Sequence, residues 1–177
     1  MELQEILHKV KWMHPRKYTI ASHKKNEFDL IVKKVEKGFC TDQFLYNLNI
    51  GDEIYATTSV VDDYDDKGGP VIVVGAGSGA SLAGCFLSSW NENSAIFEER
   101  KNNGDLKVYL GFQGQDSEPL LEHYSKLIDS GIATIGFSRS KEHHKTYVQD
   151  LLLEDKELLK KKLSKFNACF YVCGGHG

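Results

Sequence analysis

The sequence predicts an α/β protein in which a doubly wound parallel sheet follows a smaller antiparallel β region. After residue 66, four short apolar runs alternate with three segments of helical periodicity. This alternation is typical of βαβ units, which place helices on both faces of a parallel sheet. Before residue 67, strand-like segments dominate and no long helical pattern occurs. We therefore divide the chain into residues 1–66 and residues 67–177.

Composition narrows the class of protein further. The 177 residues are 41% hydrophobic and 27% charged, which excludes a disordered chain, a collagen-like repeat and a coiled coil. The length suits one ordinary domain, or one domain with a partial second. The 22 basic and 25 acidic residues leave a net charge of -3, which argues against a general nucleic-acid binder.

No targeting or metal signal is visible. The longest uncharged apolar stretch, residues 68–90, is rich in glycine and serine and does not resemble a membrane span, and no secretory signal opens the chain. The four cysteines, Cys40, Cys85, Cys169 and Cys173, lack the spacing of a zinc site. We expect a reduced, cytoplasmic protein with no metal site and no membrane segment.

The first region predicts three strands and one short helix. Residues 17–21 are β-branched and aromatic, and residues 28–35 alternate apolar and polar side chains. Residues 41–48 suit a helix capped by Thr41, and a turn at Gly51 and Asp52 leads to a strand over residues 53–59. Two or three antiparallel strands cannot close a barrel, so this region is incomplete as a free-standing domain.

The second region follows an acidic, glycine-ended loop over residues 62–69. The predicted strands are residues 71–74, 106–112, 133–137 and 168–173. The predicted helices are residues 79–99, 117–130 and 147–165.

Unusual residues follow each predicted strand of the parallel sheet, where ligands bind in open sheets. The first strand leads into Gly75-Ala76-Gly77-Ser78-Gly79, whose amides suit a pyrophosphate, although a tight strand–helix turn also needs glycine. Ser138 and Arg139 follow the third strand, with Lys145 and Tyr147 nearby. These cations suit a phosphate monoester and the ring suits adenine, which favours NADP over NAD; the alternative is a solvated basic loop.

Two further groups have both functional and structural interpretations. Cys173 at the fourth strand exit could contact a bound ring or simply pack in the protein. Upstream, Arg16 and Tyr18 on one face of a strand could hold a flavin, with Thr19 beside them. The amides of the segment Gly38-Phe39-Cys40-Thr41 could hold the flavin diphosphate.

Together these segments resemble the ferredoxin–NADP reductase superfamily, and most closely its diflavin reductase branch. Residues 16–19 resemble the R-x-Y-[ST] flavin motif, and residues 38–41 the second flavin-phosphate segment. Residues 75–79 are similar to the G-x-G-T-G nucleotide loop, residues 138–149 to the S-R…K-x-Y-V-Q signature, and residues 171–174 match Y-V-C-G. The resemblance covers residues 14 to 177.

The resemblance implies an NADPH:acceptor oxidoreductase that passes hydride from NADPH to FAD and electrons onward to an acceptor protein or FMN domain. It implies that Thr19 and Cys173 take part in hydride transfer. The implied FAD-binding residues are Arg16, Lys17, Tyr18, Thr19, Gly38, Phe39, Cys40 and Thr41. The implied NADP-binding residues are Gly75, Gly77, Ser78, Gly79, Ser138, Arg139, Lys145, Tyr147, Gln149 and Cys173.

The chain starts just before the first flavin motif and stops just after Cys173, so we expect a fragment of the family pattern. Residues 1–66 would form a partial antiparallel FAD-binding β-barrel, and residues 67–177 an NADP-binding α/β domain. Two alternatives stay open. One is an NADP-binding module without catalysis, and the other is a chain active only with a partner that completes the flavin domain.

Overall fold

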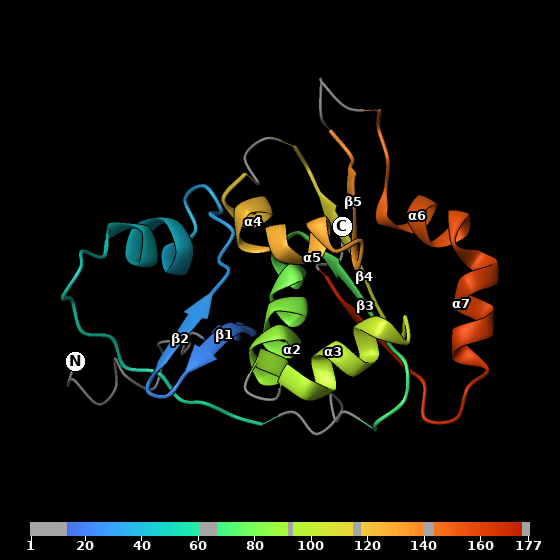
Figure 1. The fold of residues 1–177 in the computed structure, drawn as a ribbon. Coiled ribbons are helices and arrows are strands. Elements are labelled where there is room, and N and C mark those ends of the chain that lie inside the picture. The colour runs from blue at the N-terminus through green and yellow to red at the C-terminus, as the bar shows by residue number, and fades with distance from the viewer. Residues whose placement is uncertain (1–13, 61–66, 92–93, 115–117, 140–143, 175–177) are drawn as a thin grey trace, which may run out of the picture.

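A four-stranded parallel sheet forms the centre of the molecule (Figure 1). The computed structural model describes residues 14–60, 67–91, 94–114, 118–139 and 144–174. The strand order is β5-β4-β3-β6, with β3 over Val71–Ala76, β4 over Leu106–Phe112, β5 over Ala133–Phe137 and β6 over Cys169–Cys173. The four apolar runs therefore predicted these strands correctly, to within two residues.

Each predicted helix of this region is two helices in the structure. A 3₁₀ turn over Gly77–Ala80 leads into α2 (Ser81–Asn91) and α3 (Ser94–Asn102). The second segment contains α4 (Glu118–His123) and α5 (Ser125–Asp129), and the third α6 (Val148–Glu154) and α7 (Lys156–Leu163). The last break falls at Asp155, whose carboxylate accepts a 2.7 Å hydrogen bond from the Tyr109 hydroxyl on β4. Helical periodicity in the sequence does not indicate such a tertiary contact, so the break at Asp155 could not be predicted from it.

The helices cover both faces of the sheet, as predicted. The chain passes from β3 to β4 to β5 in one direction and then returns to β6 on the far side of β3. One buried cluster joins alternate strand residues such as Val73 and Val108 to Phe86 of α2 and Leu127 of α5. The other joins Ile72, Val74 and Tyr109 to Leu151 of α6 and Leu159 of α7. The period of two along each strand thus divides the core between the two faces.

The antiparallel region is a two-stranded ribbon in the described residues. It pairs β1 (Ile20–Lys24) with β2 (Glu27–Leu30), so the predicted strands over residues 17–21 and 28–35 were displaced or too long. The predicted strand over residues 53–59 was wrong, since the chain there is irregular and Tyr55 is fully exposed. A strand needs a neighbour for its backbone hydrogen bonds, and no described strand pairs with this segment.

The short helix of the first region starts earlier than the sequence predicted. It is a π-helix over Phe39–Phe44, followed by a 3₁₀ turn over Leu45–Asn47, and its N-cap is Gly38. The proposed Thr41 cap was wrong because the Thr41 hydroxyl accepts a 3.0 Å hydrogen bond from the Val35 amide upstream. The predicted turn at Gly51 is present, with the Asp52 amide donating to the Asn49 carbonyl. Residues 62–66 of the predicted loop lie outside the described residues.

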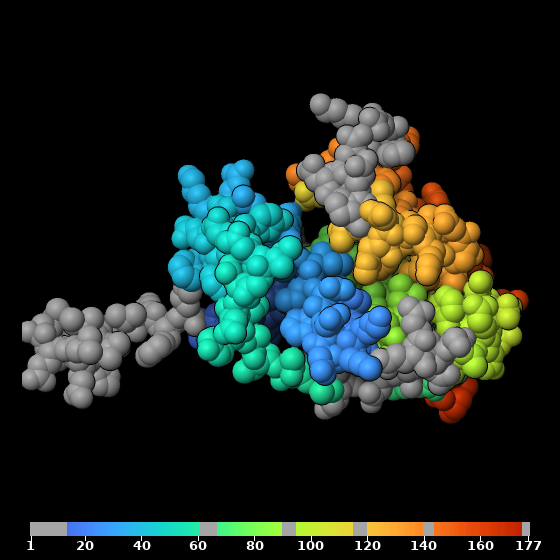
Figure 2. Space-filling model, turned by 60° about the vertical axis from the view of Figure 1, so that its left-hand side comes forward, coloured from blue at the N-terminus to red at the C-terminus, as the bar shows by residue number. Residues whose placement is uncertain are grey.

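The ribbon packs on α2 through direct backbone contact. A Cβ atom built on Gly84 would lie 2.2 Å from the Ala21 carbonyl oxygen of β1. One turn further along α2, the Ser88 hydroxyl accepts a hydrogen bond from the His23 amide. Figures 1 and 2 show the ribbon beside the sheet domain. The absence of a side chain at Gly84 therefore sets how closely the two parts approach.

We predict that Gly84→Ala destabilises the protein by about 1–3 kcal/mol, because the new methyl group must push β1 away from α2. Alanine raises helix propensity by about 1 kcal/mol, but this gain is smaller than the cost of a clash with a backbone carbonyl. Urea unfolding measures the change, with Ser89→Ala on the exposed face of α2 as the control. An unchanged unfolding midpoint for Gly84→Ala would contradict the contact.

Candidate functional site

The glycine turn after β3 lies directly against the end of β6. These strands are neighbours, with Gly75 in register with Cys173. A Cβ atom built on Gly79 would lie 2.1 Å from the Cys173 carbonyl oxygen. The chain reverses its winding direction between β3 and β6, and such a point at the carboxyl edge of an open sheet is where ligands bind.

A cavity of about 200 Å³ opens at this point. It is lined on one side by residues from before β1 and after β2, and on the other by the glycine turn and the end of β6. The lining residues are Lys17, Tyr18, Thr19, Ile31, Ser78, Gly79, Ser81, Cys173 and Gly174. The structure therefore brings together Thr19 and Cys173, which are 154 positions apart in the sequence. These are the two residues that the resemblance implicated in hydride transfer.

Three lining residues were not predicted as site residues. Ile31 directly follows β2, and Gly174 directly follows β6. Ser81 is buried at the start of α2, and its hydroxyl donates a 2.8 Å hydrogen bond to the Ser78 carbonyl within the turn. A serine at a helix start is a recognisable sequence signal, whereas the positions of Ile31 and Gly174 depend on how the two parts pack.

The two expected flavin segments are joined by a side-chain contact. The Tyr18 hydroxyl donates to the Cys40 sulfur at 3.3 Å, across 22 positions of sequence. This hydrogen bond, with partial burial, raises the pKa of Tyr18, while the nearby Arg16 charge acts in the opposite direction.

Other members of these segments lie differently from the sequence prediction. Arg16 and Tyr18 precede β1, so strand alternation does not set their faces as the sequence analysis assumed. Arg16 and Phe39 are exposed and do not line the cavity, and neither do Gly38 and Thr41.

The residues expected at the third strand exit gather at the end of β5. The Ser138 amide donates to the Phe112 carbonyl, the Arg139 amide to the Gln113 carbonyl, and the Thr146 amide to the Phe137 carbonyl. This last bond holds the segment before α6 beside the end of β5. The Lys145 ammonium lies 5.0 Å from the centre of the Tyr147 ring.

Side chains of this group are accessible to a ligand. Arg139, Lys145, Tyr147 and Gln149 are exposed, and Ser138 is half-buried. The group does not line the 200 Å³ cavity, because β4 separates β5 from β3. The structure thus presents two separate parts of the predicted nucleotide site along one edge of the sheet.

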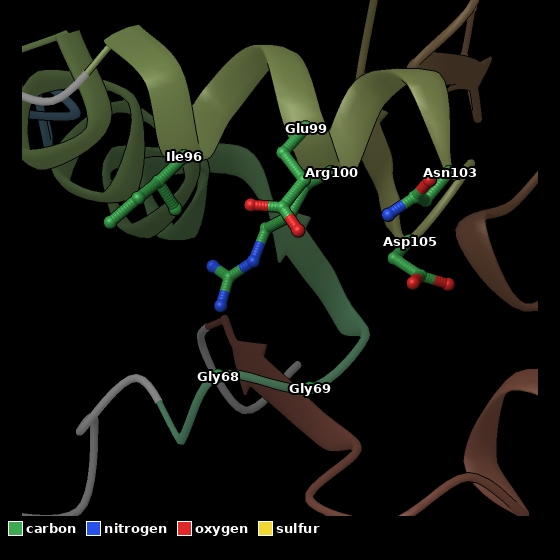
Figure 3. Close-up of a pocket in the computed structure, with 7 residues that line it drawn as sticks. All are labelled: Gly68, Gly69, Ile96, Glu99, Arg100, Asn103 and Asp105. Carbon is green, nitrogen blue, oxygen red and sulfur yellow. The ribbon is translucent and has the colours of Figure 1, made fainter.

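A larger hollow of about 420 Å³ lies at the opposite edge of the sheet (Figure 3). It is lined by Gly68, Gly69, Ile96, Glu99, Arg100, Asn103 and Asp105. Its position is at the amino ends of β3 and β4, where the Val71 amide donates to the Asp105 carbonyl. None of the predicted site residues lines it, and ligands of open parallel sheets bind at the carboxyl edge. We therefore take the smaller cavity as the candidate site.

The described part of the chain contains no group of three or more histidine, cysteine, aspartate or glutamate side chains placed to hold a metal ion. Among those same residues, no helix combines the length and apolar character needed to cross a bilayer.

Comparison with known proteins identifies the relatives of this chain, although no family model matches it. It is 28% identical over 181 residues to NADPH-dependent diflavin oxidoreductase 1 of Candida albicans, covering 93% of this chain and 29% of the relative. It is 36% identical over 109 residues to NADPH–cytochrome P450 reductase of Mus musculus, covering 59% of this chain and 16% of the relative. The chain is thus similar in sequence to diflavin reductases.

The fold also matches solved reductases. A ferredoxin–NADP+ reductase from Plasmodium falciparum, solved with 2'P-AMP, aligns with a TM-score of 0.55 and 22% identity over 89% of this chain and 66% of that one. The fold class predicted from the alternation of strands and helices is thereby confirmed, and the sequence relatives confirm the resemblance predicted from the five motifs. The chain spans less than a third of the length of the curated relatives named above.

We predict that Gly79→Ala exposes the Cys173 thiol, because a methyl group 2.1 Å from the Cys173 carbonyl oxygen must separate the turn from β6. The rate of Cys173 alkylation by iodoacetamide, followed by mass spectrometry, should rise at least about threefold. Ser78→Ala is the matched control, since Ser78 is exposed in the same turn and its change creates no clash. Equal alkylation rates in both variants would exclude this contact.

Proposed function

We propose that this chain is an NADPH-dependent flavoprotein reductase, or the FAD- and NADPH-binding part of one. The observation that supports this most directly is the cavity lined by Lys17, Tyr18 and Thr19 on one side and by Ser78 and Cys173 on the other. The relatives named above are NADPH-dependent reductases, which supports the same reaction class. We further propose that residues 1–66 form the FAD-binding part and residues 67–177 the NADP-binding part.

The residues on the first wall of the cavity suit a flavin. Lys17 supplies a cation, while Tyr18 and Thr19 supply hydroxyl groups beside the apolar Ile31. We propose that Tyr18 and Thr19 contact the flavin ring, with Thr19 beside its reactive nitrogen. Arg16, Lys17 and the segment of residues 38–41 would hold its diphosphate, and the Tyr18–Cys40 hydrogen bond keeps these two segments adjacent.

The residues along the sheet edge suit an NADP nucleotide. We propose that the turn of Gly75, Gly77, Ser78 and Gly79 holds the diphosphate, since glycine lets backbone amides approach phosphate closely. At the end of β5, Ser138, Arg139 and Lys145 would bind the 2'-phosphate, and Tyr147 and Gln149 the adenosine. The Plasmodium neighbour was solved with 2'P-AMP, which supports this assignment of ligand class.

When bound, NADPH and FAD supply the hydride donor and acceptor of the reaction. The chain's own contribution is to position these two groups relative to each other. Thr19 and Cys173 line the same small cavity from two different parts of the fold, so they can orient two rings against each other. We propose that electrons then pass to an acceptor protein or an FMN domain.

The two-stranded ribbon favours an alternative in which the chain works only with a partner. Large apolar side chains are exposed around the ribbon and the first helix, including Phe28, Phe39 and Tyr46. A partner that covers them could complete the flavin site. The other alternative is a module that binds NADP without catalysis.

Visible spectroscopy with FAD tests the proposal. The protein is mixed with FAD, passed through a desalting column, and treated with NADPH under anaerobic conditions. Retained FAD whose absorbance bleaches on addition of NADPH supports a working reductase. NADPH binding without FAD retention supports the non-catalytic module. Bleaching that appears only at high protein concentration, together with a larger particle size, supports assembly with a second copy.

We predict that Arg139→Ala weakens NADPH binding about 10- to 100-fold while changing NADH binding less than about twofold, since only NADPH carries the 2'-phosphate. Calorimetric titration of both nucleotides measures the difference. Lys160→Ala on α7 is the control, because it removes an exposed positive charge far along the chain from this group. Equal losses for NADPH and NADH would rule out the phosphate contact.

A further inference from the structure

A buried tyrosine contacts the glycine turn from the side of the hydrophobic core. Tyr124 lies between α4 and α5 and is fully buried. Its hydroxyl donates a 2.6 Å hydrogen bond to the carbonyl of Ala80, which is 44 positions away in the sequence. Ala80 is the last residue of the turn over Gly77–Ala80, so the phenol reaches the turn from the side of the core.

The same hydroxyl also contacts the start of α2. A Cβ atom built on Gly84 would lie 3.1 Å from the Tyr124 oxygen, so the hydroxyl lies close to the backbone of α2 at this residue. Ala80 and Gly84 are four residues apart, which is the spacing of a helical hydrogen bond. The phenol therefore lies beside the first turn of α2, where burial raises its pKa far above the usual value.

The turn is thus held by two buried hydroxyl groups. The Ser81 hydroxyl binds the Ser78 carbonyl, and the Tyr124 hydroxyl binds the Ala80 carbonyl. Each bond joins a buried hydroxyl group to a carbonyl group of the short turn that precedes α2. The loss of a hydrogen bond made by a buried hydroxyl is costly, so removal of either hydroxyl favours a rearranged turn.

We infer that Tyr124 is a positioning residue of the nucleotide site, which holds the Gly77–Ala80 turn in the geometry that accepts a diphosphate. This inference rests on the proposed function of the turn. Tyr124 is shielded from the cavity and lines neither hollow, so it acts through Ala80 and not through contact with the ligand.

Removal of the Tyr124 hydroxyl by Tyr124→Phe tests this inference, since phenylalanine retains the ring that fills the core. The matched control is Tyr109→Phe. Tyr109 is also fully buried, and its hydroxyl also donates one short bond, to Asp155 at 2.7 Å, but on the other face of the sheet. The melting temperature of each variant is measured beside its nucleotide affinity, so that general destabilisation is recorded separately.

A comparison of two ligands distinguishes the contribution of the turn to binding from that of the rest of the site. NADP+ contains the diphosphate, whereas adenosine 2'-monophosphate carries the 2'-phosphate and adenine without it. We expect Tyr124→Phe to weaken the binding of NADP+ about three- to tenfold, which is equivalent to the loss of one hydrogen bond. The affinity for adenosine 2'-monophosphate should stay within about 1.5-fold of that of the unaltered protein. We expect Tyr109→Phe to leave both affinities unchanged.

The outcomes are distinguishable. If the unaltered protein binds both ligands and Tyr124→Phe binds NADP+ as tightly, this inference is wrong while the proposed function stands. If Tyr124→Phe and Tyr109→Phe weaken both ligands equally, Tyr124 is structural only and the inference is again wrong. If the unaltered protein binds neither ligand, the proposed function fails and the inference fails with it.

Discussion

The arrangement of the candidate site depends on two close backbone contacts at the beginning of α2. Gly79 lies against the Cys173 carbonyl at the end of β6, and Gly84 lies against the Ala21 carbonyl of β1. These glycines are five positions apart, so one short stretch of chain contacts both the parallel sheet and the antiparallel ribbon. A side chain at either position would force the neighbouring backbone away, because a Cβ atom would lie little more than 2 Å from an oxygen. The 200 Å³ cavity lies between the parts that these contacts hold together.

The mostly uncharged lining of the cavity and the cations at the end of β5 lie at separate places along the sheet edge. Lys17 is the one basic side chain among the lining residues of the cavity, which otherwise offer hydroxyls, a thiol and an apolar side chain. Arg139 and Lys145 lie at the end of β5, two strands from β3. Neighbouring strands are about 4.8 Å apart, so these cations are on the order of 10 Å along the edge from the glycine turn. A nucleotide with its diphosphate at the glycine turn and its 2'-phosphate at Arg139 and Lys145, as proposed above, would extend along this distance.

Sequence patterns predicted the parallel sheet well because each strand there satisfies its hydrogen bonds within the chain. The apolar runs at residues 106–112 and 133–137 correspond to β4 and β5 at both ends. The antiparallel region was predicted less well, and residues 53–59 form no strand. Val, Ile, Thr and Tyr side chains favour strands, yet a strand exists only where a neighbour accepts and donates its backbone hydrogen bonds. The sequence similarly predicted Thr41 as a helix cap, but in the structure its hydroxyl accepts a hydrogen bond from the Val35 amide.

The sequence by itself determined the order of strands and helices, the residues of the glycine turn and the grouping of Ser138 with Arg139, since these follow from local periodicity and spacing. It also determined the family resemblance. The tertiary structure alone decided that Thr19 and Cys173 line one cavity, that Tyr18 bonds to Cys40, and that Tyr124 reaches Ala80. Such contacts join residues tens of positions apart, and they depend on how closely whole elements pack. Local sequence patterns carry no measure of that distance.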